Sequence, residues 1–115
     1  MVTCSIYGRE TRLQGSPLTL VIYNQEFGGD LMQDIVEAYK DGNLHPAYLL
    51  KIAWAMAKTA EPTLPHFEEW MNGFDDKKFS LLDTQAWGVI DSAINAELFC
   101  GKKTTKRLKS NGDKQ

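Results

Sequence analysis

The chain of 115 residues is 43% hydrophobic and 24% charged, which is ordinary for a globular protein and sufficient for one domain with a single core. No apolar run approaches the roughly 18 residues that cross a bilayer, and the N-terminus lacks the basic and then apolar pattern of a secretory signal. We therefore expect neither a membrane protein nor an exported one.

The formal net charge of −2 conceals an uneven distribution. Residues 1–101 hold seven basic and fourteen acidic side chains, whereas residues 102–115 hold six basic side chains and one acidic. Such a contrast marks the last segment as physically distinct from the rest. We expect one folded domain over residues 1–101 and a basic, disordered tail over residues 102–115.

The first fourteen residues contain two short strand-like runs on either side of a glycine. Val2, Cys4 and Ile6 alternate with polar residues, and Gly8-Arg9 is a candidate for the reversal. This pattern predicts an N-terminal β-hairpin. An isolated two-stranded hairpin is marginal in water, so it must pack on the helices or pair with another chain.

Residues 17–27 are ambiguous, because their β-branched content suits a strand as well as a helix. The pair Ser16-Pro17 is a typical helix start, and Gly28-Gly29 is a typical stop. We therefore predict a helix. One face of it would carry Leu18, Val21, Ile22 and Gln25.

A second helix is predicted from Asp30, which is a good N-cap with Gln33 in the capping-box position. Residues 41–43, with the sequence D-G-N, end it. The spacing predicts an apolar stripe made of Met32, Ile35, Val36 and Tyr39.

Residues 44–59 form the most apolar stretch, and on a helical wheel apolar side chains occupy nearly the whole circumference. Only Lys51 and Lys58 are charged, and they lie seven residues apart on one narrow strip. A helix of this kind is normally buried, so we predict that it is the core of the fold. Trp54 lies beside the lysine strip. Core packing is the usual role of such an aromatic residue; the alternative is that Trp54, Lys51 and Lys58 border an apolar surface that is left open for a partner.

Two further amphipathic helices follow. The first, over residues 64–72 with Thr63 as a candidate cap, places Phe67, Trp70, Met71 and Phe74 at helical spacing. The last begins at Ser80 or Asp83, runs to about Phe99, and carries a stripe of Trp87, Ile90, Ile94 and Leu98, with Asp91 and Asn95 on the opposite side. The predicted fold class is mainly α: a compact bundle of about five helices with a small N-terminal β-hairpin, which is α+β by strict count.

The sequence offers little that is typical of catalysis. His45 and His66 have no metal-ligand partners at recognisable spacing, and Gly28-Gly29 lacks the pattern of a phosphate-binding loop. Adjacent acidic pairs project in different directions on a helix, which does not suit acid–base chemistry. Cys4 and Cys100 are expected to be reduced thiols. We predict no catalytic, cofactor or metal site, and no enzyme activity.

The order of several short motifs resembles a known family. A hairpin is followed by S-P-L-T-L, N-Q-E-F-G-G-D, A-W-A-M-A-K-T, P-x-F-E-E-W and a last helix that ends in L-F-C-G-K-K. Over residues 1–103 this order resembles the tail assembly chaperones of long-tailed bacteriophages that infect Gram-positive bacteria.

The resemblance implies a protein without enzyme activity that works in the host cytoplasm and is absent from the mature virion. Such chaperones bind the tape measure protein and hold it in solution while tail tube subunits polymerise around it. In this family a ribosomal frameshift often yields a longer form that recruits the major tail protein, and Gly101-Lys102-Lys103 is compatible with a slippery codon run. Many copies on one long client would gain from multivalency, so we also expect weak self-association.

The alternative is a small phage or bacterial regulator that binds nucleic acid through residues 102–115. Against it, the tail lacks the aromatic or arginine-rich interleaving of nucleic-acid-binding segments, and residues 1–101 are acidic. The sequence therefore favours a protein-binding chaperone over a nucleic-acid-binding regulator.

Overall fold

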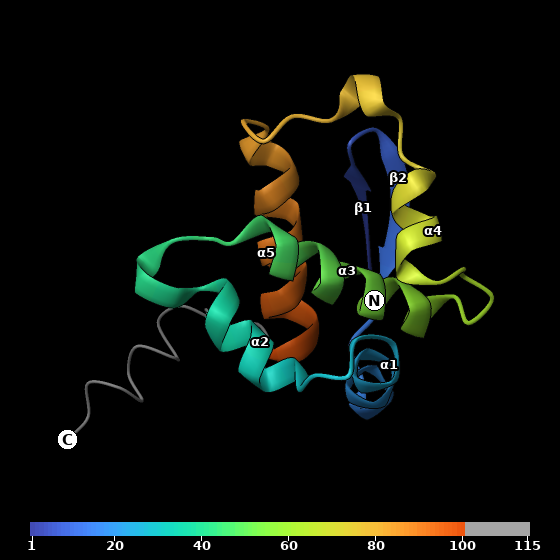
Figure 1. Cartoon of the computed structure of the whole chain (residues 1–115), viewed down its shortest axis with the longest axis vertical. Helices are drawn as coiled ribbons and strands as arrows, with labels where there is room; N and C mark the ends of the chain where they lie inside the picture. Colours follow the sequence, from blue (N-terminus) through green and yellow to red (C-terminus); the bar gives the residue numbers. More distant parts are fainter. Residues whose placement is uncertain (101–115) are drawn as a thin grey trace.

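A computed structural model describes residues 1–100 of the chain. Helix α3 (Pro46–Ala60) lies at its centre and packs against α1, α2, α4, α5 and strand β2 (Figure 1). The buried residues of α3 are Leu49, Ile52, Ala53, Trp54, Ala55, Met56 and Ala57. The prediction of a core helix is confirmed, with its start at Pro46 rather than at residue 44.

The other elements surround α3. In chain order they are β1 (Val2–Ile6), β2 (Arg9–Leu13), α1 (Pro17–Phe27), α2 (Leu31–Ala38), α4 (Phe67–Asn72) and α5 (Thr84–Leu98). Two short 3-10 turns, Lys40–Gly42 and Asp76–Lys78, join α2 to α3 and α4 to α5. Within residues 1–100 this is the predicted mainly α fold, with five helices and an N-terminal hairpin.

The hairpin is antiparallel, with Ile6 opposite Arg9 and Val2 opposite Leu13. The reversal is made by Tyr7 and Gly8, which have φ of 50° and 80°, so the predicted position at Gly8-Arg9 is wrong by one residue. Positive φ at both central residues matches the twist of paired strands. The inward face packs on helices, with β2 against α3 and β1 against α5.

One carboxylate on α5 fastens both ends of this hairpin. Glu97 lies 2.9 Å from the N-terminal ammonium and accepts a hydrogen bond from the Gly15 N–H at 3.0 Å. The chain passes so close to α5 here that a Cβ on Gly15 would lie 2.3 Å from the Glu97 carbonyl oxygen. A glycine is therefore required at this crossing.

Local signals set both ends of α1 and the start of α2 as predicted, whereas α2 ends at Ala38, before the D-G-N segment that is predicted to end it. Ser16 accepts a hydrogen bond from the Leu18 N–H, and Gly28 ends α1 with a left-handed φ of 71°. Asp30 caps α2 by accepting from the Gln33 N–H at 2.9 Å. The strand alternative for residues 17–27 is thereby excluded.

The predicted inward face of α1 is largely wrong, and that of α2 is right at two of its four residues. On α1, Thr19 and Tyr23 are fully buried while Leu18 and Val21 are exposed. The buried hydroxyls are satisfied: Thr19 Oγ1 lies 2.7 Å from Thr59 Oγ1, and Tyr23 donates to Asp34 at 2.6 Å. On α2, Ile35 and Tyr39 are buried as expected, but Met32 and Val36 are exposed.

Helix α4 is capped from outside its own sequence. Neither Thr63 nor the N-cap residue His66 supplies a side-chain cap; instead Glu26 of α1 accepts a hydrogen bond from the Phe67 N–H. Helix α5 starts after Asp83, one of the two predicted starting points. Its predicted stripe is buried at Trp87, Ile90 and Ile94 and partly buried at Leu98.

Asp91 of α5 differs from its predicted outward position. It is half-buried and accepts a hydrogen bond from the Tyr39 hydroxyl, while Asn95 donates to the Asp91 carbonyl. This polar contact joins the end of α2 to α5.

Among residues 1–100, no helix is long and apolar enough to cross a membrane. The predicted basic tail and the slippery-codon position fall outside the described residues.

Candidate functional site

The apolar surface expected at Trp54 does not exist in this fold. Trp54 is only 2% exposed, and its indole N–H donates to the Pro65 carbonyl at 2.9 Å. Phe27 of α1 and Phe67 of α4 pack edge-on against its ring, with centroids 5.6 and 6.5 Å away. Trp54 is therefore excluded as a partner-binding residue, because α1, α4 and the segment before α4 cover it.

The two lysines predicted beside Trp54 also make contacts within the chain. Lys51 Nζ lies over the rings of Phe27 and Tyr48, 5.2 and 5.3 Å from their centroids. Lys58 donates to the Leu64 carbonyl. The lysine strip thus serves to hold α1 and the segment before α4 against α3, and the structure does not bring the three predicted residues together as an open surface.

The outer face of α1 is unusual for a helix at the surface of a globular protein. It exposes Leu18, Leu20 and Val21, each about half accessible, beside the polar Asn24 and Gln25, and the helix has no charged residue except the partly buried Glu26. A helix on the surface of a globular protein normally turns charged or polar side chains outward. An outer face of this kind is typical of a surface that another molecule covers.

Helix α2 extends this apolar surface. Met32 is 51% exposed and Val36 is 41% exposed. Leu20 and Met32 both line a groove of about 360 Å³ that also contacts Ile35 and, from the end of α5, Leu98 and Phe99. We name Leu18, Leu20, Val21, Met32 and Val36 the α1–α2 apolar surface.

A second exposed apolar group lies at the other end of the long axis, in the segment that precedes α5 (Figure 1). Phe79 is half exposed, Leu81 is 63% exposed and Leu82 is 88% exposed. Phe79 packs its ring against Tyr7, whose buried hydroxyl has no hydrogen-bond partner within residues 1–100. This group is smaller than the α1–α2 apolar surface and lies on an irregular segment.

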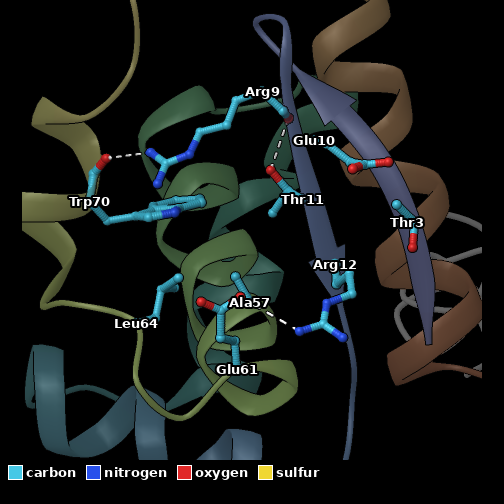
Figure 2. A pocket seen from close by; sticks show the side chains of 9 residues that line it. All are labelled: Thr3, Arg9, Glu10, Thr11, Arg12, Ala57, Glu61, Leu64 and Trp70. Carbon is cyan, nitrogen blue, oxygen red and sulfur yellow. Dashed lines mark hydrogen bonds and ion pairs between the residues drawn. The ribbon is translucent and has the colours of Figure 1, made fainter.

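A third feature is a polar groove of about 400 Å³ between β2 and α4 (Figure 2). Arg9 crosses one end and donates to the Trp70 carbonyl at 3.3 Å. At the other end Arg12 lies 3.6 Å from Glu61. The groove therefore runs beside the outer edge of the hairpin.

Two carboxylates with lowered pKa values, Glu26 and Glu97, make structural contacts. Burial works to raise the pKa of Glu26, but hydrogen bonds from His66 and from the Phe67 N–H outweigh it, so that the pKa is lowered. The pKa of Glu97 is lowered by the N-terminal ammonium and by the Gly15 N–H.

Among residues 1–100 no three His, Cys, Asp or Glu side chains gather as a possible metal site. Cys4 and Cys100 are both free thiols.

Sequence reasoning missed the α1–α2 apolar surface, although one signal for it was present. Residues 17–27 carry apolar side chains all round the helix and a single charge, which requires that one face remain apolar whichever face is buried.

Comparisons of the chain with protein-family models, with curated proteins and with solved structures found no significant match.

Proposed function

We propose that this protein is a phage tail assembly chaperone that binds the tape measure protein through the α1–α2 apolar surface and holds it in solution. The observation that carries the proposal is the uncharged outer face of α1, continued by Met32 on α2. An amphipathic helix lays its apolar side into a groove of this kind, and a long tape measure helix presents such a side repeatedly.

Two further points support the same function. The order of motifs along residues 1–103 resembles that of tail assembly chaperones. Weak contacts at each copy are sufficient when many copies line one client, so self-association on the client is part of the proposal. The site of action is the host cytoplasm, without enzyme activity, and the chaperone leaves before the virion is complete.

The proposal is tested by co-expression with the tape measure protein of the same phage. Leu20→Lys and Met32→Lys should reduce the soluble fraction of the tape measure protein by about tenfold, because each places a charge in the groove. The matched controls are Leu81→Lys and Leu82→Lys, which alter apolar residues at the other end of the molecule that are still more exposed. Loss of solubility with the controls, or none with the groove variants, would contradict this site.

A longer product that recruits the major tail protein is part of the proposed function. It requires a slippery heptamer near codons 101–109 and an overlapping frame downstream, and the nucleotide sequence decides this. Removal of residues 102–115 separates the chaperone from the nucleic-acid-binding alternative. If the protein is a chaperone, the shortened chain should still bind the apolar client. If it is a regulator, the shortened chain should lose its salt-sensitive binding to nucleic acid.

A further inference from the structure

The outer edge of β2 presents backbone groups that the hairpin does not use. A two-residue turn makes Ile6 and Arg9 the hydrogen-bonded pair that closes the hairpin. Along an antiparallel ladder, hydrogen-bonded pairs alternate with pairs that are not hydrogen-bonded to each other. The N–H and C=O groups of Glu10 and Arg12 therefore point away from β1. Gln14 lies two residues after Arg12, so its backbone groups point in the same direction. Its N–H donates outside the hairpin to the Met56 carbonyl at 3.1 Å, which confirms this direction.

The polar groove lies where a further strand would pair with this edge. Neighbouring strands are about 4.8 Å apart, and Figure 2 shows the groove beside β2, between Arg9 and Arg12. On the side away from β2 it is lined by Ala57, Glu61, Leu64 and Trp70, of which Ala57 and Trp70 are almost fully buried and Leu64 is half-buried. A short extended segment in this groove would thus have backbone donors and acceptors on one side and the partly exposed Leu64 beside Glu61 on the other.

The side chains of β2 specify the chemistry of that segment. Glu10 and Arg12 are exposed on the outer face of the hairpin, whereas Thr11 is buried on the inner face. In an antiparallel strand, an acidic residue would lie opposite Arg12 and a basic residue opposite Glu10, with an apolar residue between them facing inward. Opposite charges at facing positions stabilise strand pairing. Arg12 would give up its ion pair with Glu61 in order to pair with the acidic residue of the peptide. Because the Arg12–Glu61 pair is half exposed, its loss opposes binding only weakly.

We propose that the β2 edge is a second protein-binding site, which adds one extended peptide strand with the pattern acidic, apolar, basic. A single strand fits the groove better than a second folded copy does. Leu64 and Trp70 stand opposite β2, and a second copy would bring its own α4 into the same space. This site is distinct from the α1–α2 apolar surface, and binding there does not depend on the function proposed above.

The test uses the full chain, labelled for NMR, and the peptide acetyl-Thr-Glu-Val-Lys-Val-Thr-amide. Bound peptide should slow hydrogen exchange of the Glu10 and Arg12 amides, while the Thr11 amide, already bonded within the hairpin, should change little. A peptide with Glu and Lys exchanged should bind about fivefold more weakly. The double variant Glu10→Lys with Arg12→Glu should reverse this preference, and since both side chains are exposed its fold should be unaltered.

Several outcomes would overturn the proposal. They are no binding of either peptide at millimolar concentration, equal affinity of the wild type for both peptides, or protection of Thr3 and Ser5 on the β1 edge instead. Protection of Glu10 and Arg12 without peptide, together with a dimer in light scattering, would show that a second copy is the occupant. Co-expression with the tape measure protein should be unaffected by this double variant, so the two proposals fail separately.

Discussion

Glu26 of α1 accepts a hydrogen bond from the backbone N–H of Phe67, 2.8 Å away, and thereby caps a helix that begins 41 residues later in the chain. Its other oxygen lies 2.9 Å from His66 Nδ1. A carboxylate at this position satisfies a free N–H and complements the positive end of α4. The contact also holds α1 and α4 together over Trp54.

Replacing Glu26 by Ala should lower the free energy of unfolding by about 1 kcal/mol, the usual cost of a lost N-cap. Urea denaturation measures the change. The matched control is Gln25→Ala, which removes an exposed polar side chain on the same helix and should leave the unfolding midpoint unchanged. Equal midpoints for the two variants would show that the cap contributes nothing.

The buried pair Thr19 and Thr59 should be energetically coupled. Thr19 Oγ1 also accepts from the Ser16 N–H at 3.1 Å, so Thr19→Val leaves both that N–H and the Thr59 hydroxyl without this partner. We expect Thr19→Val to destabilise the fold by about 1–3 kcal/mol. In a double-mutant cycle with Thr59→Val, the combined loss should be smaller than the sum of the single losses, because the second change removes a group already deprived of its partner. Additive losses would contradict the pairing.

Acid should weaken the fold partly through Glu97. Its folded-state pKa is lowered, so its contribution to stability is fully present above its unfolded pKa of about 4.3 and is lost as the pH falls through the lower folded value. The free energy of unfolding should therefore fall as the pH is lowered below about 5. Glu97→Gln, which cannot ionise, should show a shallower fall in urea titrations over that range. Identical slopes for variant and wild type would contradict the role of this carboxylate.

Two glycines should respond in opposite directions to the same substitution. A Cβ on Gly88 in α5 would meet nothing within 4 Å, so Gly88→Ala should raise stability by about 0.5–1 kcal/mol through the gain in helix propensity. Gly15→Ala should lower stability by about 1–3 kcal/mol, because its Cβ would collide with the Glu97 carbonyl and force α5 away from the hairpin. Thermal unfolding distinguishes the two, and a stabilising Gly15→Ala would show that the crossing relaxes freely.

The sequence predicted what is decided within a few residues and failed where distant elements decide. Ser16, Gly28 and Asp83 mark helix ends through bonds to their own neighbours, and each lies where expected. The inward face of α1 depends on Thr59 and Asp34, which no local period reveals. Trp54 is covered by α4 and Pro65, whose positions follow from the tertiary fold.

The candidate binding surface shows the same division. The excess of apolar residues in positions 17–27 is visible in the sequence, but which of them remain exposed is not. Leu20 and Met32 become neighbours in one groove only because α1 and α2 pack on α3 from adjacent sides and the end of α5 completes the lining. A surface built from three elements cannot be obtained from the period of any one of them.

The ion pair of Glu97 with the N-terminal ammonium and its hydrogen bond from Gly15 affect how the hairpin opens. The first fifteen residues form a loop whose two ends are fastened to one point of α5. Neither strand can fray outward from its own end while that carboxylate holds, so the two strands open together or not at all. The hairpin should therefore behave as one cooperative unit of local unfolding, with similar opening free energies for the amides of β1 and β2 that bond across the ladder.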